Sequence, residues 1–586
     1  MMTTSPIFVL TLLSVAYLPL SLQQDEDIPH NDVKSWALKF GVGLWEFGRQ
    51  YTKMNEIQRK YHDMEAEVVR KDGLLLIREM AGEVKNMMDI KMNAVMRIMD
   101  SAEQAALSHK QEGGSARYYN SRRLNNVDND QGSSQDLPLT SNRHFDHQPV
   151  NTTVSSVLLP RALSDSEPQV ANALRWSEFL DPVFVNNYEM DPTLSWQFFG
   201  STTGFLRRFP AIKWPSDEVT ARKDLHDFRW SSWFVGAATS PKDVVILLDS
   251  SGSMTGATRQ LAHATVSAIL DTLTDNDFVN VFTFSDITQE LISCHKDILI
   301  QATEANKKEL NAALNKIKFE NIANFTGALI SGFEILGKYN RTGQGSQCNQ
   351  AIMLITDGPP HSYREIFKNY NWPHMPVRVF TYLVGRDTSN ANEMNWMACA
   401  NKGYYEHIQT LSEITEKVLN YIKVIARPMI MYQNDHPIQW TPVYAGGKSN
   451  NILQSSVMEG QLMTTVSTPI FDRRNYSERA ANLLGVVGTD IPIQQLMKLV
   501  PPYKLGVNGY AFIVNNNGHL LYHPDLRPLL NKNLFIETLK PNYNSVDLSS
   551  VELVDSDFLM NENNSFLMDL RHDMIDQKEG ETELKA

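Results

Sequence analysis

Short apolar runs alternate with helical stretches in the central part of the chain, residues 243–425. The runs at 244–248 and 351–355 contain only apolar side chains, which is typical of parallel strands that are covered on both faces. After the first run, four apolar positions recur at helical spacing: Ala262, Val266, Ile269 and Leu273. This alternation predicts a Rossmann-like, doubly wound α/β domain over 243–425.

The amino-terminal part of the chain follows a helical period instead. Between residues 31 and 109, apolar side chains recur every three or four positions, which predicts a long amphipathic helix that is broken near Gly73 and then resumes. The first apolar positions are Trp36, Phe40, Leu44, Phe47, Tyr51, Met54, Ile57, Tyr61, Met64 and Val68. Packing within the chain is the favoured role of this stripe, and binding to a partner is the alternative. We assign residues 23–110 to this helical segment.

The remaining stretches follow neither pattern. Residues 111–150 are rich in Gly, Ser, Asn, Asp and Arg and poor in aliphatic side chains, which predicts a flexible, exposed linker. Residues 151–242 mix aromatic side chains with turn residues. Beyond the central domain, the pattern predicts a strand and a helix over 483–500, and a hairpin with an Asn-Asn-Gly turn over 508–528.

An apolar run, Ile7–Leu20, opens the chain and is followed by small, polar and then acidic residues. This order is typical of a secretory signal peptide, although no Lys or Arg precedes the run, and we predict one over 1–22. A retained signal anchor is the alternative, but the run is short for a membrane span, and no later stretch reaches the roughly 20 apolar residues that a membrane helix needs. The mature chain is therefore expected in the secretory pathway, without a membrane anchor, either secreted or held at the cell surface by a partner.

The charge of the chain argues against one class of partner. Its 586 residues include 54 Lys and Arg against 67 Asp and Glu, which gives a formal net charge of −13. Nucleic-acid binding needs a basic face, so we expect none. The length allows several domains, because single cores rarely exceed roughly 250–300 residues. Residues 541–586, which end in a polar, acidic run, are expected to form a tail.

A carboxylate and two hydroxyls follow the first apolar run in one turn, as Asp249, Ser251 and Ser253. Alone, this pattern also fits a helix cap, which is a common use of Asp and Ser. Two further positions favour a metal site over a helix cap, because Thr326 precedes a helical run and Asp357 ends the second apolar run. Hydroxyl and carboxylate oxygens suit Mg²⁺, Ca²⁺ or Mn²⁺.

Together these five positions resemble the metal-ion-dependent adhesion site of von Willebrand factor A domains, whose ligands come from three loops. The resemblance implies a divalent metal, Ca²⁺ or Mg²⁺, held by five side chains: Asp249, Ser251, Ser253, Thr326 and Asp357. These ligands leave an octahedral shell incomplete, so an Asp or Glu of a protein partner is the expected occupant of the open position. A hydrolytic site would need a base beside a bound water, and no HExxH or similar pairing accompanies the loops. We therefore expect metal-dependent binding and no enzymatic activity.

Cysteines and sequons fit an extracellular protein. The three cysteines, Cys294, Cys348 and Cys399, cannot all pair within the chain, which indicates an intermolecular bridge or a free thiol. Four sequons are expected to carry glycans, at Asn151, Asn340, Asn475 and Asn563. A fifth, at Asn324, includes the proposed ligand Thr326, and we expect it to be unoccupied because a glycan would crowd the metal.

The segments on both sides of the central domain look like two parts of one Cache domain, a PAS-like α+β fold that often holds small ligands. The hairpin at 508–528 and the strand before it carry this resemblance. It implies that 151–242 and 426–540 form a single Cache domain, into which the von Willebrand factor A domain, 243–425, is inserted.

The whole combination resembles the alpha-2/delta auxiliary subunits of voltage-gated calcium channels. It includes the signal peptide, the helical segment, the inserted domain, and the phrases RPM at 427–429 and HPDLRP at 523–528. The resemblance implies a subunit on the extracellular face of the pore-forming alpha-1 subunit, bound through a carboxylate on the metal and raising channel surface expression and calcium current.

Family members continue into a second Cache region and a delta segment, so the chain is expected to be a fragment or a short form. Cys399 resembles the family cysteine that forms a disulfide with the delta peptide. Pairing of Cys399 with Cys294 or Cys348 is the alternative.

The same resemblance gives a second candidate site, for an amino acid or a gabapentin-like drug. Relatives bind such ligands with an Arg two residues before a Trp-aromatic pair and with a distant Asp. Here the pair is Trp233–Phe234 and the Asp is Asp490, but Ser231 stands at the Arg position and Arg229 lies nearby. Serine cannot replace a bidentate guanidinium, so the clamp is incomplete. An adhesion protein that uses the same metal and a Cache-type amino-acid sensor remain the alternative functions.

Overall fold

A computed structural model describes residues 30–65, 70–109, 117–124, 137–145, 147–160, 163–214, 227–386, 388–432, 436–446, 461–473, 482–506, 508–524, 529–533, 536–539, 546–552 and 562–583. The expected signal peptide, 1–22, lies outside these ranges. By its internal contacts, the chain divides into two compact units, residues 1–76 and 77–586. Within the described ranges, no helix combines the length and the apolar character that a membrane span requires.

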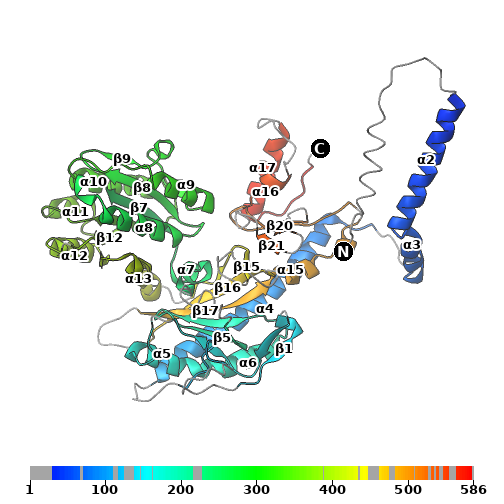
Figure 1. The fold of residues 1–586 in the computed structure, drawn as a ribbon, viewed down its shortest axis with the longest axis horizontal. Helices are drawn as coiled ribbons and strands as arrows, with labels where there is room; N and C mark the ends of the chain where they lie inside the picture. The colour runs from blue at the N-terminus through cyan, green and yellow to red at the C-terminus, as the bar shows by residue number, and fades with distance from the viewer. Residues whose placement is uncertain are drawn as a thin grey trace. The chain divides into compact units, whose positions relative to one another are not determined.

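The central domain is built on a sheet of seven strands in the order β10-β8-β7-β11-β12-β13, with β9 beside β8 (Figure 1). The strands are β7 (Lys242–Asp249), β8 (Phe278–Phe284), β9 (Thr288–Glu290), β10 (Ile300–Gln301), β11 (Asn349–Thr356), β12 (Val377–Val384) and β13 (Tyr405–Ile408). β7 pairs in parallel with β8 and β11, while β9 and β10 are antiparallel to β8. Every residue of β7 is buried, as expected for a central strand that is covered on both faces.

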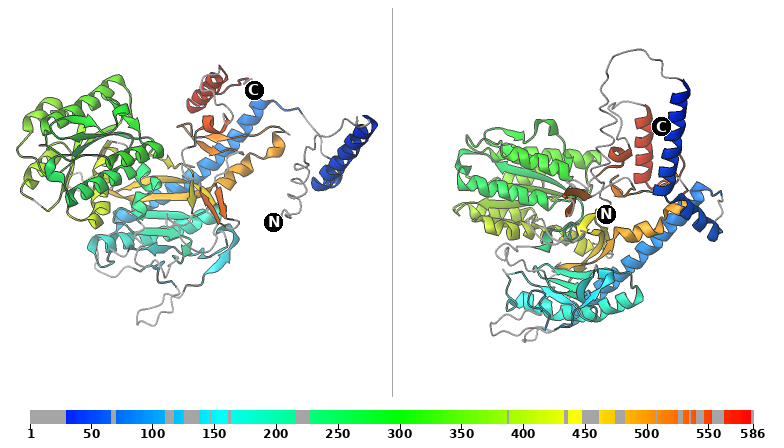
Figure 2. Two further views of the ribbon diagram at one scale, coloured as in Figure 1. Left: turned by 45° about the horizontal axis from the view of Figure 1, so that its top comes forward. Right: turned by 45° about the vertical axis from the view of Figure 1, so that its right-hand side comes forward.

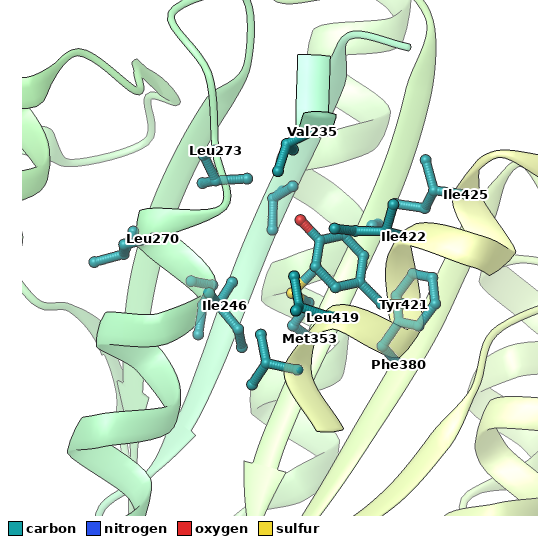
Figure 3. Close-up of a cluster of buried hydrophobic side chains, with 14 of the residues drawn as sticks. Val235, Ile246, Leu270, Leu273, Met353, Phe380, Leu419, Tyr421, Ile422 and Ile425 are labelled. Atoms are coloured by element: carbon teal, nitrogen blue, oxygen red, sulfur yellow. The ribbon is translucent and has the colours of Figure 1, made fainter. Parts of the chain in front are cut away.

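Helices cover both faces of this sheet, because alternate side chains of β7 point to opposite sides. Val245 and Leu247 pack with α10 (Phe325–Thr342), α11 (Arg364–Tyr370) and α12 (Ala391–Ala400). Ile246 and its neighbours on the other face pack with α7 (Ser232–Ala238), α8 (Ala257–Asp271), α9 (Glu304–Leu314) and α13 (Ile414–Ile425). Figure 3 shows part of this second cluster, with Ile246 among side chains of α8 and α13. The doubly wound α/β prediction is confirmed.

The segments before and after the central domain build a second, antiparallel sheet in the order β14-β16-β17-β4-β5-β3, with β15 beside β16. Its strands are β3 (Ser156–Leu158), β4 (Gln197–Ser201), β5 (Leu206–Phe209), β14 (Gln439–Trp440), β15 (Tyr444–Gly446), β16 (Gln461–Phe471) and β17 (Leu483–Pro492). β4 pairs directly with β17, for example Gly200 with Val486. Since this pairing joins chain on both sides of 243–425, the central domain is an insertion in the second sheet (Figure 2).

The helical segment is interrupted more often than its period predicts. It consists of α2 (His30–Tyr51), α3 (Met54–Asp63) and α4 (Gly73–Ser108). Lys53, between α2 and α3, has a φ of 51°, and this left-handed residue interrupts the helix. α4 buries Val95 and Ile98 against α5 (Pro168–Ser177), α6 (Asp181–Met190) and the second sheet, but no described residue of α2 or α3 is buried. Packing within the chain is therefore confirmed for α4, and for α2 and α3 it stays a prediction.

Part of the expected linker has regular structure. Within 111–150, the chain forms β1 (Thr140–Asn142), a 3-10 turn and β2 (Gln148–Asn151), and β2 pairs with β6 (Ala211–Ile212). The few apolar residues explain the difference, because Phe145 and Val150 are buried together with Trp196. The linker prediction is wrong for residues 140–150.

The carboxyl-terminal part contains the expected strand, helix and hairpin, and more structure than a tail. β17 is followed by α15 (Ile493–Leu499), and the hairpin consists of β18 (Ile513–Val514) and β19 (Leu520–Tyr522). The other elements are α14 (Arg427–Tyr432), β20 (Leu529–Asn533), β21 (Ile536–Leu539), α16 (Leu548–Glu552) and α17 (Glu562–Ile575). Leu548 and Leu567 are buried against Leu520, so the tail prediction is wrong for α16 and α17.

A buried ion pair lies where the central strands β7 and β8 begin. The ammonium of Lys242 is fully buried and donates to the Asp277 carboxylate at 2.8 Å. Burial alone would lower the pKa of Lys242, but the charge of Asp277 raises it above its usual value. In the folded chain this pair therefore contributes stability below the unfolded-state lysine pKa of about 10.4, and the contribution is lost as the pH rises through the higher folded-state pKa.

Asp277→Asn should lower the free energy of unfolding of the central domain by about 3–5 kcal/mol at neutral pH, because the buried ammonium loses its counter-charge. Urea unfolding followed by tryptophan fluorescence measures the change. The control Glu304→Gln removes ion pairs with Lys307 and Lys308, in which the Glu304 side chain is 46% exposed, and should cost less than about 1 kcal/mol. Equal losses in the two variants would contradict this account of Lys242.

Candidate metal centre

Asp249 is the last residue of β7, and its buried carboxylate is held between two loops. Its Oδ1 accepts a hydrogen bond from the Ser251 N–H at 2.9 Å, and its Oδ2 accepts one from the Thr356 hydroxyl at 2.7 Å. Because β7 and β11 are parallel neighbours, Thr356 at the end of β11 reaches the same edge of the sheet as Asp249. The carboxylate is thus fixed in one orientation.

Ser251 and Ser253 lie in the turn after β7, with their hydroxyl oxygens 3.0 Å apart. The alternative that this turn caps the next helix is wrong, because the N-cap of α8 is Gly256 and no side chain caps that helix. The 3-10 turn that follows Ser251 has no side-chain cap either. The two hydroxyls are therefore not used as helix caps.

Thr326 is exposed in the first turn of α10. The loop before this helix is bonded to the turn after β7. The Gly252 N–H donates to the Asn321 carbonyl at 3.0 Å, which joins the two loops. Asn324 is the N-cap of α10, since its Oδ1 accepts from the Gly327 N–H at 3.1 Å. The expectation that no glycan is attached to Asn324 stays a prediction.

Asp357 follows β11 and is half-buried at the same sheet edge. Burial raises the pKa of Asp249, hydrogen bonds from Ser251 and Thr356 lower it, and the negative charge of Asp357 raises it, so that the net shift is upward. Two carboxylates that repel each other at a buried position favour a cation between them.

The donor set fits a hard divalent cation. Asp249, Ser251, Ser253 and Asp357 lie at one edge of the central sheet, and the loop that leads to Thr326 is joined to this edge. All five side chains offer oxygen, which Ca²⁺ and Mg²⁺ prefer. Within the part of the chain that the structure describes, no three His, Cys, Asp or Glu side chains gather as a metal site. A centre at this edge would therefore depend on its hydroxyl ligands as well as on Asp249 and Asp357.

The residues of the second candidate site are brought together only in part, because Arg229 and Phe234 line one small pocket and Asp490 does not. Arg229 donates to the Asp227 carboxylate at 2.7 Å and to the Thr202 carbonyl at 3.3 Å, and it lines a small pocket with Leu483. Leu483 and Asp490 lie near opposite ends of β17, roughly 20 Å apart along the strand. Arg229 and Asp490 therefore cannot clamp one small ligand.

Trp233 and Phe234 lie in the core instead. Both are buried and pack against Phe228, with the Trp233 ring also 4.5 Å from that of Phe198. Trp233 is thus used in packing, while Phe234 packs on Phe228 and also lines the small pocket beside Arg229. The ligand-binding role of the pair stays a prediction.

Asp490 lies beside side chains whose proximity the sequence did not predict. Its Oδ1 accepts from the hydroxyls of Thr465 at 2.7 Å and Tyr444 at 2.9 Å. Burial raises the pKa of Asp490 and the charge of Arg208 lowers it, with a net upward shift. Arg208 also lies 3.8 Å from the centre of the Trp196 ring. The strand alternation of 206–209 was the signal that could have placed Arg208 on the face opposite Arg207.

The modification sites have the following positions. Asn340 is exposed on α10, Asn151 ends β2, Asn475 lies outside the described residues, and Asn563 lies in α17. Cys294, Cys348 and Cys399 are all exposed and unpaired. The structure therefore does not contain the alternative bridge from Cys399 to another cysteine of this chain.

Comparison with known protein families identifies the same central domain. The family model described as von Willebrand factor type A domain matches residues 243–420, and the one described as VWA N-terminal matches residues 100–214. The human voltage-dependent calcium channel subunit alpha-2/delta-4 is 43% identical over 94% of this chain and 48% of its own length. The rat subunit alpha-2/delta-3 is 40% identical over 98% of this chain and 52% of its own length.

A more distant relative, the mouse subunit alpha-2/delta-2, is 32% identical over 85% of this chain and 43% of its own length. The chain thus spans about half the length of these curated relatives. It is homologous, over nearly its whole length, to the voltage-dependent calcium channel alpha-2/delta subunits, and it is built around a von Willebrand factor type A domain.

Proposed function

We propose that this protein is an auxiliary subunit of a voltage-gated calcium channel and binds the extracellular face of the pore-forming alpha-1 subunit through a divalent metal. Its homology to proteins named as alpha-2/delta subunits supports the channel assignment. The observation that carries the binding mode is the buried Asp249 carboxylate, fixed at the sheet edge by Ser251 and Thr356 and facing the charge of Asp357.

Each ligand has a distinct part in this centre. Asp249 supplies a fixed carboxylate oxygen, and Ser251 and Ser253 supply neutral oxygens from the same turn. Thr326 and Asp357 bring ligands from the other two loops. A bound Ca²⁺ or Mg²⁺ supplies positive charge that attracts an anionic oxygen. Because three of the five ligands are neutral, the carboxylate of an Asp or Glu of the alpha-1 subunit completes the shell and joins the two proteins.

Other features support an extracellular position in the secretory pathway. Cys399 is exposed on α12, which suits a disulfide to a separate delta peptide. Asn340 is exposed, which suits a glycan. The separation of Arg229 from Asp490 speaks against an amino-acid sensor. The proposed role of the chain is to raise channel surface expression and calcium current, with no catalytic step.

The triple variant Asp249→Ala, Ser251→Ala, Ser253→Ala should remain folded but fail to raise the surface density of a co-expressed alpha-1 subunit, because it removes three of the five metal ligands. Surface biotinylation and whole-cell calcium current measure this effect. The matched control Glu365→Ala removes an exposed carboxylate from α11 and should behave as the parent chain. Parental surface density and current from the triple variant would reject the metal-bridged mode.

On acidification, metal affinity should begin to fall at a higher pH than it would if Asp249 had the usual pKa of an aspartate. A ligand carboxylate must be deprotonated to hold a metal, and the pKa of Asp249 is raised above its usual value of about 3.9. For the metal-free chain the sign is the opposite, because the folded state holds the proton more tightly and gains stability as the pH falls through this raised pKa. Calorimetric titration with Mg²⁺ or Ca²⁺ at a series of pH values measures the affinity. Affinity that stays constant down to pH values near the usual aspartate pKa would contradict the prediction.

A further inference from the structure

Two large aliphatic side chains are unusually exposed beside the candidate metal centre. Ile322 is 84% exposed and Ile287 is 68% exposed. Ile322 lies in the loop that leads to Thr326, and Ile287 lies in the loop that follows β8. Both loops adjoin the turn with Ser251, since Asn321 accepts from the Gly252 N–H and the Ser250 N–H donates to Phe284. Neither side chain is used to hold the loops together.

Hydrogen bonds join the two loops that carry these residues. The Asn321 side chain donates to the Asp286 carboxylate at 3.2 Å, and Ile322 and Ile287 each follow one member of this pair. The Asn324 N–H donates to the Ser285 carbonyl at 2.7 Å, and the Ser285 N–H donates to the Ile287 carbonyl at 3.2 Å. The two joined loops therefore both present an exposed isoleucine, Ile287 and Ile322, and we term these two residues the apolar rim.

The rim also carries negative charge. Asp286 is exposed, and hydrogen bonds from Ser285 and Asn321 lower its pKa, so it stays ionised. Glu320, whose N–H donates to the Ser250 carbonyl, is exposed in the same loop as Ile322. A second acidic residue in a partner segment would be repelled by these charges.

We infer that the centre recognises an acidic side chain only together with a neighbouring bulky apolar side chain, which packs on Ile287 and Ile322. This inference rests on the proposed function, and it adds the chemistry of the partner: a segment with one Asp or Glu, an adjacent Leu, Ile, Met or Phe, and no second acid nearby. A single carboxylate on a metal competes with water and carries little sequence information. The apolar contact supplies the selectivity, because an aliphatic side chain removed from water stabilises a complex.

Synthetic peptides test this inference without the channel. Three six-residue peptides with blocked ends carry one Asp followed by Leu, one Asp followed by Ser, or two adjacent Asp residues. Binding to the immobilised full chain in saturating Mg²⁺ is measured by surface plasmon resonance. The Asp-Leu peptide should bind about 10-fold more tightly than the Asp-Ser peptide, the factor that burial of one aliphatic side chain provides, and the peptide with two Asp residues should bind least.

The double variant Ile287→Ser, Ile322→Ser should lose the preference for Asp-Leu and keep the rise in melting temperature with Mg²⁺. The matched control Ile298→Ser changes another exposed isoleucine, 40% exposed, whose carbonyl accepts from Asn280 near the opposite end of β8. This control should keep the preference.

Equal binding of the Asp-Leu and Asp-Ser peptides to the parent chain would overturn the inference, as would a preference that survives in the double variant. Absence of all peptide binding by a chain whose melting temperature still rises with Mg²⁺ would also overturn it. If the peptide preference holds but the parent chain does not raise alpha-1 surface density, the proposed channel function fails and the apolar rim stands.

Discussion

The electrostatic cost of a buried carboxylate at the end of the central strand is the constraint on which the rest of the structure depends. Asp249 is buried and faces Asp357, and a buried charge without a partner is unfavourable. The Ser251 N–H and the Thr356 hydroxyl reduce this cost but do not supply positive charge. A divalent cation would supply it, so the proposed function couples metal binding to the stability of the sheet edge. In that proposal the same cation attracts an acidic partner.

The doubly wound sheet makes this arrangement possible because its parallel strands end at one edge. β7 and β11 carry Asp249 and Thr356 to the same level, and backbone hydrogen bonds join the loop after β7 to the loop that precedes α10. The second sheet supports the inserted domain through a continuous apolar cluster in which Val244 and Ile246 lie together with Trp233 and Val486. This continuity explains why Trp233 and Phe234 of α7 are both buried.

Sequence alone predicted the parts of the structure that depend on local pattern. The runs that became β7 and β11, the helical spacing of α8 and the positions of Asp249 and Asp357 at strand ends all follow from short stretches of chain. The positions of residues fixed by long-range pairing could not be predicted. Arg208 lies near Asp490 only because β5, β4 and β17 are neighbours in the second sheet. The burial of Phe145 and Val150 was not predicted, because two apolar side chains do not change the composition of a polar stretch.

The apolar stripe of α2 and α3 shows a further limit of periodicity. Trp36 and Phe40 recur at helical spacing as a buried face would, yet they are 58% and 73% exposed. The spacing of apolar residues identifies the helix and its apolar face, but not what covers that face. The same distinction applies to Ile322, whose exposure becomes informative only because its loop is joined to the turn that carries two of the proposed metal ligands.

The most direct test of the metal-bridged association is capture of a purified alpha-1 subunit by the immobilised full chain, in Ca²⁺ or Mg²⁺ and again with a chelator, beside the Asp249→Ala variant. The account predicts capture by the parent chain with metal, release by the chelator, and none by the variant. Capture that persists in the chelator and in Asp249→Ala would contradict the account and place the contact elsewhere on the chain.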